Sequence, residues 1–170
     1  TLTGANTYTG GTNLTDGTIK VGSNTALGTG ASSSLAMSDG TTLESGAASV
    51  TLANAVAITG TGTVDTNPGN TLTLSGVVSG GALTKIDTGT LVLTGANTYT
   101  GGTNLNAGTI QVGNNTALGA GTLAMATNTT LDAGTADRTL GNAVAITGTS
   151  TVDTNHWLSL IHISEPTRPR

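Results

Sequence analysis

The sequence contains no cysteine and no phenylalanine, and its 170 residues include one tryptophan and two tyrosines. The absence of cysteine excludes a disulfide scaffold and a zinc site built on thiolates. Charged residues make up 8% of the chain, against roughly 25% in ordinary globular domains. Five basic residues cannot form a patch that neutralises phosphates, which argues against a nucleic-acid-binding protein. No run of about 18 apolar residues is present, so we expect no membrane-spanning helix.

Threonine, glycine, asparagine and serine supply more than half of the chain, with 38 threonines and 26 glycines. These residues are poor helix formers, so a helical protein is nearly excluded. The net charge of -4 is small, and the apolar residues occur in short regular sets of valine, isoleucine and leucine. High net charge is the usual companion of disorder, and β-branched residues favour strands. The composition therefore indicates an all-β protein.

Comparison of the chain with itself reveals a long internal repeat. The thirteen residues LTGANTYTGGTNL at Leu2–Leu14 recur without a change at Leu93–Leu105, an offset of 91 residues. After three extra residues, 31–33, the offset becomes 88, and NAVAITGT at Asn54–Thr61 recurs at Asn142–Thr149. A period of this length is typical of solenoids and related repeat architectures. We therefore divide the chain into a first copy over residues 1–91, a second copy over 92–155 and a tail over 156–170.

A finer rhythm runs inside each copy. Segments such as Thr71-Leu72-Thr73-Leu74 alternate apolar and polar residues, which is the pattern of a half-buried strand, and turn residues separate them. Three short strands and three turns would close a coil of about twenty residues, so a parallel β-helix, or solenoid, explains the spacing best. On this basis 91 residues make about four coils, and we expect Leu2 and Leu93 to face the same side of the rod. An antiparallel sandwich and a disordered or amyloid-like tract are the alternatives. The predicted core residues are Leu14, Ile19, Val21, Val56, Ile58, Leu93, Leu105, Ile110, Val112, Val144 and Ile146.

The repeated residues resemble a known family. TLVLTGANTYTGGTNLNAGTIQVG at Thr90–Gly113, together with its copy at Thr1–Gly22, is similar to the passenger-associated transport repeat, an autotransporter-associated β-strand repeat of Gram-negative bacteria. The resemblance implies a right-handed parallel β-helix that is exported through the outer membrane by a C-terminal barrel of its own chain. It also implies a role of the repeat in passenger folding and export. Because residue 1 already lies inside a repeat, we expect an internal piece without a signal peptide.

The tail departs from the repeat pattern. In the first copy TVDTN is followed by Pro68, and in the second by His156 and Trp157. Residues 158–168, LSLIHISEPTR, resemble the translated end of a common sequencing adapter. We therefore expect residues 156–170 to be non-native or disordered and not to continue the coils. The alternative is a genuine, divergent linker.

The body of the chain offers little that could perform chemistry. It has no histidine, so a nucleophile would depend on a lysine, and we expect Lys20 and Lys85 to be solvated. Tyr8 and Tyr99 occupy equivalent positions and are expected to pack over a turn rather than to stack on a sugar.

Two pairs of acidic residues recur between the copies, Glu44 with Asp132 and Asp65 with Asp153. Each acid would lie several coils from its copy, too far for paired carboxylate chemistry, so a capping or solvated position is expected. The sequence thus predicts no catalytic, cofactor-binding or metal-ligating residue, no cofactor and no enzyme.

The leading functional hypothesis is a structural β-helical stalk of an adhesin-type passenger. It would be displayed at the cell surface or outside the cell and anchored through the outer membrane. Its partner would be its own C-terminal barrel, and other parts of the passenger would contact host or surface glycans or proteins. Neither nucleic acid nor direct membrane insertion is expected. The alternative is a threonine-rich binding module for ice or glycans, because triplets such as Thr71-Leu72-Thr73 are frequent.

Overall fold

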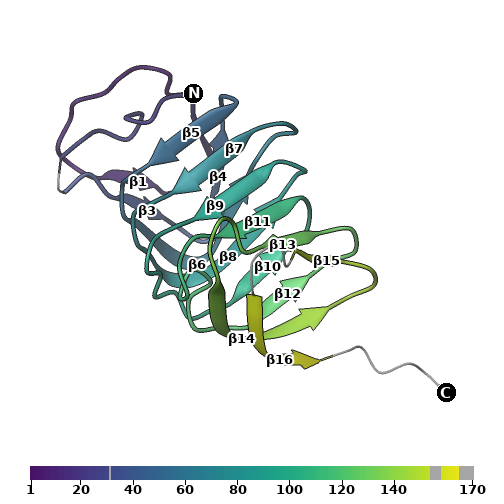
Figure 1. Cartoon of the computed structure of the whole chain (residues 1–170). Helices are drawn as coiled ribbons and strands as arrows, with labels where there is room; N and C mark the ends of the chain where they lie inside the picture. Colours follow the sequence, from purple (N-terminus) through teal and green to yellow (C-terminus); the bar gives the residue numbers. More distant parts are fainter. Residues whose placement is uncertain (31, 154–157, 165–170) are drawn as a thin grey trace.

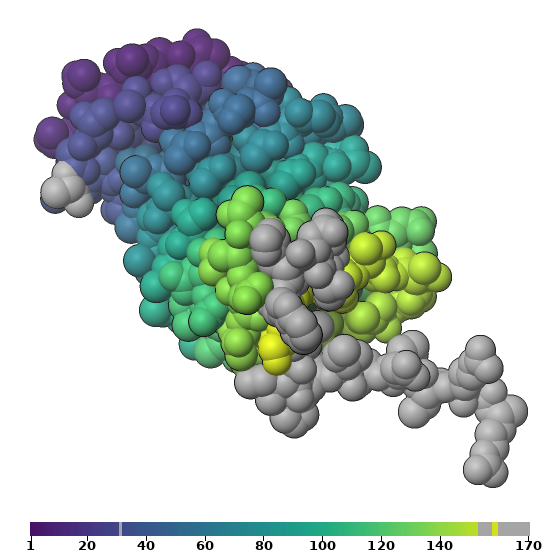
Figure 2. Space-filling view, in the orientation of Figure 1, coloured from purple at the N-terminus to yellow at the C-terminus, as the bar shows by residue number. Residues whose placement is uncertain are grey.

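The computed structural model describes residues 1–30, 32–153 and 158–164, which form parallel strands stacked as a β-solenoid of about seven coils. The described residues contain no helix. Figure 1 shows the strands lying across a single rod, and Figure 2 shows the sequence advancing from one end of that rod to the other. The all-β solenoid is confirmed. The right-handed sense of the coil, which the resemblance implies, stays a prediction. The strands are β1 (Thr12–Leu14), β2 (Thr18–Val21), β3 (Leu35–Met37), β4 (Thr42–Ser45), β5 (Ser49–Leu52), β6 (Val56–Asp65), β7 (Thr71–Leu74), β8 (Val78–Ile86), β9 (Thr90–Leu93), β10 (Thr103–Leu105), β11 (Thr109–Val112), β12 (Leu123–Met125), β13 (Thr130–Asp132), β14 (Arg138–Ile146), β15 (Thr151–Asp153) and β16 (Leu158–Ser164).

The strands occupy three faces of the rod. The first face is the six-stranded sheet β5-β7-β9-β11-β13-β15. The second face contains β1, β3 and the first halves of β6, β8, β14 and β16. The third face contains β2, β4, β10, β12 and the second halves of those four long strands. The second and third faces join into one ten-stranded sheet, because the long strands continue around the corner between them.

The long strands turn that corner at irregularities in their pairing. The register between β6 and β8 shifts between Ile58 and Thr61, and Gly60 and Gly80 on either side have positive φ values of 69° and 94°. Glycine adopts such angles without the steric cost that a side chain would bring. A bulge of this kind bends a strand sharply without breaking its pairing to both neighbours.

The core is a narrow column of inward-pointing side chains. Along β5, β7, β9 and β11 every second residue is buried, as the alternation in sequence predicts. Nine of the eleven predicted core residues are buried, and the other two, Ile19 and Ile146, are half-buried and pack against the same cluster. Each fully buried aliphatic side chain contributes roughly 1.5–3 kcal/mol relative to an exposed one. The column therefore holds the coils together along the whole described rod.

The two copies of the repeat lie on different faces. β1 lies on the second face, where Thr12 pairs with Leu35 of β3. β10 has the same three residues, yet it lies on the third face, where Thr103 pairs with Leu83 in the second half of β8. The second copy is therefore displaced around the rod by one face.

Leu2 and Leu93 show the same displacement. Leu2 bridges to Val21 on the third face, whereas Leu93 pairs with Leu74 and Val112 on the first face. The expectation that the two leucines face the same side is wrong. The reason is coil length: neighbouring strands in register are 19 to 24 residues apart, so 91 residues span four coils and one additional face.

The three-residue insertion of the first copy lies between β2 and β3. Ser32 and Ser33 are outside any strand, as expected for an insertion that leaves the inward set of residues unchanged. Ser33 is nevertheless buried, and its hydroxyl donates to the carbonyl of Tyr8 at 3.1 Å. Ala31 lies outside the described residues.

The end of the described chain does continue the solenoid. β16 pairs in parallel with β14, so the expectation that the tail leaves the coils is wrong for Leu158–Ser164. The segment alternates apolar and polar residues at Leu158-Ser159-Leu160, and its pairing covers an edge of β14 that would otherwise be open. His156 lies outside the described residues, as do 165–170. The likeness of residues 158–168 to an adapter and the division of the chain at residue 155 stay predictions.

Candidate functional site

The recurring motif joins consecutive coils. In the second copy it links β9 to β10 and follows the second face without forming a regular strand. The Thr98 N–H donates to the carbonyl of Val78 at 2.9 Å, and the Thr100 N–H donates to the carbonyl of Gly80 at 3.0 Å. The backbone of the motif therefore docks on the coil that precedes it.

The side chain of Asn97 spans three consecutive coils. Its Oδ1 accepts a hydrogen bond from the Val78 N–H at 2.8 Å, in the preceding coil. Its Nδ2 donates to the carbonyl of Ala117 at 2.6 Å, in the following coil. Asn97 is 3% exposed, so without this amide the Val78 N–H would lose its partner and the Ala117 carbonyl would lose its shorter hydrogen bond.

Tyr99 supplies a second link to the following coil. Its hydroxyl lies 2.7 Å from Oγ1 of Thr103 and 3.5 Å from the carbonyl oxygen of Ala117. The ring lies against Gly119, where an added Cβ would come within 3.0 Å of ring atom Cδ2 and still closer to the Tyr99 carbonyl. Gly119 also has a positive φ of 58°, so a larger residue is disfavoured there on two grounds. Burial raises the pKa of the Tyr99 phenol well above its usual range.

The first copy repeats these contacts toward the following coil. Nδ2 of Asn6 donates to the carbonyl of Ala26 at 2.8 Å, and the hydroxyl of Tyr8 lies 2.7 Å from Oγ1 of Thr12. The ring of Tyr8 lies against Gly28, as that of Tyr99 lies against Gly119. The same residues of the motif thus perform the same task in both copies.

A second asparagine holds the other side of the turn beneath the motif. In the second copy this turn is residues 115–119, and Asn142 donates from Nδ2 to the carbonyls of Leu118 at 3.2 Å, Gly119 at 3.1 Å and Gly121 at 2.6 Å. In the first copy Asn54 donates to the corresponding carbonyls of Leu27, Gly28 and Ser33. Asn54 and Asn142 are 8% and 3% exposed. Two asparagines therefore hold each turn. In the second copy both Asn97 and Asn142 are buried, whereas in the first copy Asn54 is buried and Asn6 is half-buried.

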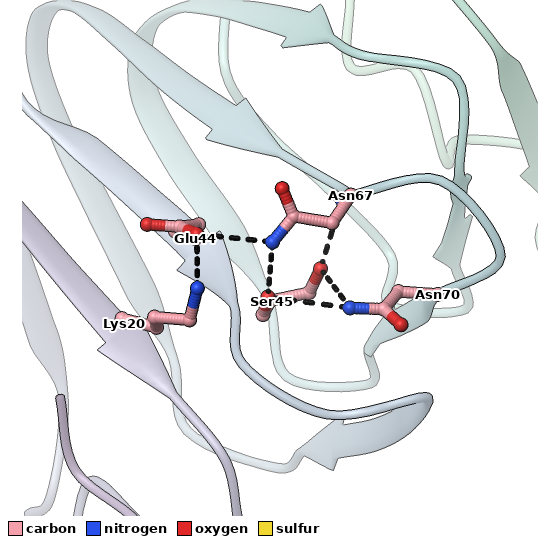
Figure 3. A network of polar contacts seen from close by, with 5 residues as sticks. All are labelled: Lys20, Glu44, Ser45, Asn67 and Asn70. Atoms are coloured by element: carbon pink, nitrogen blue, oxygen red, sulfur yellow. Dashed lines mark hydrogen bonds and ion pairs between the residues drawn. The ribbon is translucent and has the colours of Figure 1, made fainter.

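A polar network joins three coils at the corner between the third and first faces (Figure 3). Lys20 Nζ lies 2.5 Å from Oε1 of Glu44, which also accepts from Nδ2 of Asn67 at 3.0 Å. Asn67 further bonds to the carbonyl and the hydroxyl of Ser45, and Asn70 approaches the same two oxygens. The ammonium of Lys20 and the amide of Asn67 lower the pKa of Glu44.

Asp65 lies beside Glu44 in the ladder, one coil further along. Its Oδ1 is buried without a hydrogen-bond partner, and desolvation together with the charges of Asp87 and Glu44 raises its pKa. Each acid was expected to lie several coils from its own copy, and the proximity of Glu44 to Asp65 was not predicted. Lys20 and Asn67 already bond to Oε1 of Glu44. Glu44 therefore links neighbouring coils and does not form a pair of free carboxylates with Asp65.

Lys85 is buried, which contradicts the expectation that it is solvated. Its side chain is among the largest that are fully buried, at 0% exposure. Nζ donates to the carbonyls of Ile86 at 2.7 Å, Asp87 at 2.5 Å and Ala107 at 3.3 Å. Burial lowers its pKa to about 8, although the charges of Asp87 and Asp65 act in the opposite direction. Lys20 has a side chain that is 36% exposed and forms an ion pair with Glu44, so the expectation of a solvated lysine describes Lys20 better than Lys85.

The motif contacts coincide with the parts of the chain that match a known family. Residues 1–21 and 83–112 match the family described as passenger-associated-transport-repeat. Both segments contain the asparagine and tyrosine that join the coils. The chain carries autotransporter passenger repeats.

A relative extends the likeness of these passenger repeats beyond the matched segments. The chain is 42% identical over 114 residues, or 66% of its length, to the adhesin BmaC autotransporter of Brucella suis biovar 1 (strain 1330). It spans 3% of the length of that adhesin. No solved structure matches the chain.

The residues singled out in the passenger repeats from sequence divide into two groups. Glu44 and Asp65 are brought together with Lys20 at one corner, whereas Asp132 lies on the first face next to Gln111, whose Nε2 donates to it at 2.7 Å. Tyr8 and Tyr99 pack over turns as expected.

Asn97, Asn142 and Lys85 were not predicted from the sequence to join coils. Their signal was the period-2 alternation, since Leu91, Leu93, Gly95, Asn97 and Tyr99 are all buried.

The described residues show few features of a ligand site. No group of three or more histidine, aspartate or glutamate side chains among them is placed to hold a metal ion. A cavity of about 290 Å³ opens beside the insertion of the first copy and is lined by neutral residues, of which Asn54 and Ser33 are already bonded to backbone groups. Within the described parts of the chain there is no helix long and apolar enough to span a bilayer.

Proposed function

We propose that the chain is a structural stalk segment of an autotransporter passenger of the adhesin type, which supports export and holds other parts of the passenger away from the cell. The proposal assigns the segment no catalytic step and no cofactor. The passenger would be displayed at the surface of a Gram-negative bacterium and anchored by the outer-membrane barrel of its own chain. Contacts with glycans or proteins would be made by other parts of the passenger.

One observation carries the proposal: in the second copy the recurring motif turns the side chains of Asn97 and Tyr99 into the rod. Asn97 is 3% exposed and Tyr99 is fully buried, and both bond to the carbonyl of Ala117 in the following coil. In addition, the two copies of the motif lie on different faces. A repeated binding surface would present the same residues outward on one side, whereas a device that joins coils needs no common face.

The strand pairing and apolar burial that each new coil gains would also favour outward movement of the chain during export. Each coil contacts only its neighbours, so coils can be added one at a time as the chain emerges. Burial of the inward leucines and valines supplies free energy at every addition. About once in every four coils, the motif would stabilise the coils on either side of it through Asn97 and Tyr99.

Surface display of a tagged segment tests this role. The chain is placed in frame between an N-terminal epitope and an outer-membrane translocator, and surface epitope is measured by flow cytometry before and after external protease. Asn97→Ala is expected to reduce surface epitope several-fold, whereas Thr98→Ala, at an exposed neighbouring position, is expected to leave it unchanged. Equal display of the Asn97→Ala variant and the unmodified segment would contradict the proposal.

A second candidate, a threonine-rich binding face, has one observation in its favour. A single file of hydroxyls runs along the first face with one residue per coil, and the file consists of Ser49, Thr71, Thr90, Thr109, Thr130 and Thr151. The adjacent file holds threonine at only two positions, Thr51 and Thr73, before it changes to Val92, Gln111 and Asp132. Measurable thermal hysteresis of the purified chain would favour this candidate over the stalk.

A further inference from the structure

Lys85 interrupts an otherwise apolar file in the core. Lys85 pairs with Val64 in the preceding coil and with Leu105 in the following coil. All three side chains are buried, with exposures of 0 to 1%. A lysine in such a file costs free energy unless its ammonium finds hydrogen-bond acceptors, because an unpaired buried charge is unfavourable.

The acceptors come from two different coils. Ile86 and Asp87 belong to the corner that directly follows Lys85, and Ala107 belongs to the corner of the next coil. Asp87 adopts a positive φ of 62°, which is uncommon for a residue other than glycine. The side chains of Asp65 and Asp87 are the negative groups that act on the ammonium. The link from Lys85 to Ala107 crosses the junction between the last coil of the first copy and the first coil of the second.

Register is poorly defined by the apolar residues at this junction. A shift by two residues keeps the same residues inward, because side chains alternate with a period of two. Leucine, valine and threonine then exchange places at modest cost. In coiled coils a single buried polar side chain fixes the register of the partners at a cost in stability, and setting register is the best-attested role of buried polar groups.

We propose that Lys85 fixes the register between β8 and β10. In the observed register its ammonium reaches the carbonyl of Ala107 while Lys85 faces Leu105. A shift by two residues places Thr103 or Ala107 opposite Lys85 and carries the Ala107 carbonyl along the strand direction, away from Nζ. The shifted pairing then leaves the buried ammonium with fewer acceptors, so it is disfavoured. Lys85 is a positioning residue in this account.

Engineered disulfides can read the register directly, since the chain contains no cysteine of its own. Thr84 and Asn104 are ladder partners, so the pair Thr84→Cys/Asn104→Cys reports the observed register. The pair Thr84→Cys/Asn106→Cys reports a shift by two residues, because a diagonal separation is too long for a disulfide in the observed register. Each pair is placed in the full chain with Lys85, with Lys85→Met and with the matched core control Leu83→Met. The chain is refolded under oxidising conditions and the cross-linked fraction is measured in the folded monomer.

With Lys85 or Leu83→Met, we expect the Thr84/Asn104 cross-link to predominate and the Thr84/Asn106 cross-link to stay at background. With Lys85→Met, the shifted cross-link is expected to rise at least fivefold, even if the variant is as stable as the original chain. Should Lys85→Met fail to give folded monomer, the same readout is taken on Lys85→Gln, which keeps one donor group and is expected to give a smaller rise. Unchanged cross-link ratios in the folded Lys85 variants would overturn the proposal and leave Lys85 as a core filler.

Discussion

Tyr8 and Tyr99 occupy the same position of the recurring motif, yet Tyr8 is 39% exposed and Tyr99 is fully buried. Both rings lie against a glycine of the following coil, Gly28 for Tyr8 and Gly119 for Tyr99. Only the segment around Tyr99 also docks on a preceding coil, through hydrogen bonds from Thr98 and Thr100. We infer that Tyr99 is buried because a preceding coil covers its segment, whereas Tyr8 has no such coil over it among the described residues.

Removal of the tyrosine hydroxyl should have unequal effects in the two copies. Tyr99→Phe leaves the buried hydroxyl of Thr103 without its partner and is expected to lower the free energy of unfolding by about 1–2 kcal/mol. Tyr8→Phe breaks the matching bond to Thr12 at an exposed position, where water replaces it, so a change below about 0.5 kcal/mol is expected. Urea denaturation followed by circular dichroism gives both values. Equal losses in the two variants would contradict the account of the buried link.

Replacement of the motif asparagine should show the same asymmetry more strongly. Asn97→Ala removes bonds to Val78 and Ala117, two buried backbone groups, and is expected to cost about 3 kcal/mol. Asn6→Ala removes one bond to Ala26 from a half-buried side chain and is expected to cost about 1 kcal/mol. The comparison is made by urea denaturation at one pH and salt concentration. A larger loss for Asn6→Ala than for Asn97→Ala would be incompatible with a side chain that spans three coils.

Two neighbouring carboxylates should respond in opposite directions to neutralisation. The pKa of Glu44 is lowered in the folded state, so its ionised form stabilises the fold above the unfolded pKa, and this contribution is lost as the pH falls through the folded pKa. The pKa of Asp65 is raised, so its protonated form is favoured by folding, and this contribution is lost as the pH rises through the folded pKa. At pH 7 we expect Glu44→Gln to lower the melting temperature and Asp65→Asn to raise it. At a pH below both values the two variants should approach the original chain, and the same sign for both changes at pH 7 would refute the assignment.

Lys85 should make the fold more stable in mild alkali. Its pKa is about 8 in the folded state against 10.5 ordinarily, so the unfolded chain binds more protons between these values and stability rises with pH across that window. Between pH 8 and pH 9.5 the rise amounts to about 1.5 kcal/mol for this residue, because the folded lysine is already half deprotonated at pH 8. The window ends below the ionisation of Tyr99, whose raised pKa acts in the opposite direction. Unfolding by urea at several pH values should show this rise in the original chain and its absence in Lys85→Met.

Alternation in the sequence was sufficient to predict the strands and most of the core, because side chains in a strand point to opposite faces with a period of two. The same alternation places Lys85 inward two residues after Leu83, and Asn97 inward after Leu93 and Gly95. Lys85 was expected to be solvated because charged side chains are usually exposed, and no role was predicted for Asn97. Their acceptors are corner carbonyls of other coils, which no local pattern reveals.

The face on which each strand lies could not be predicted from the sequence. The length of a coil, measured between ladder partners on the first face, varies from 19 to 22 residues, since corners can lengthen without moving the inward residues. A difference of one or two residues in each coil accumulates over 91 residues to one whole face. The sequence therefore predicts that Leu2 and Leu93 point inward but does not determine where they lie around the rod.

The displacement of the second copy by one face is the central claim, and a pair of disulfides tests it most directly. Val92 and Gln111 are ladder partners on the first face, so Val92→Cys/Gln111→Cys should cross-link nearly completely in the folded chain. If the copies were instead related by a whole number of coils, β11 would stack like β2 on the third face, beside Ile86 at the end of β8. We expect Val92→Cys/Gln111→Cys to cross-link and Ile86→Cys/Gln111→Cys not to cross-link. Efficient cross-linking of Ile86 with Gln111 in its place would contradict the displacement by one face.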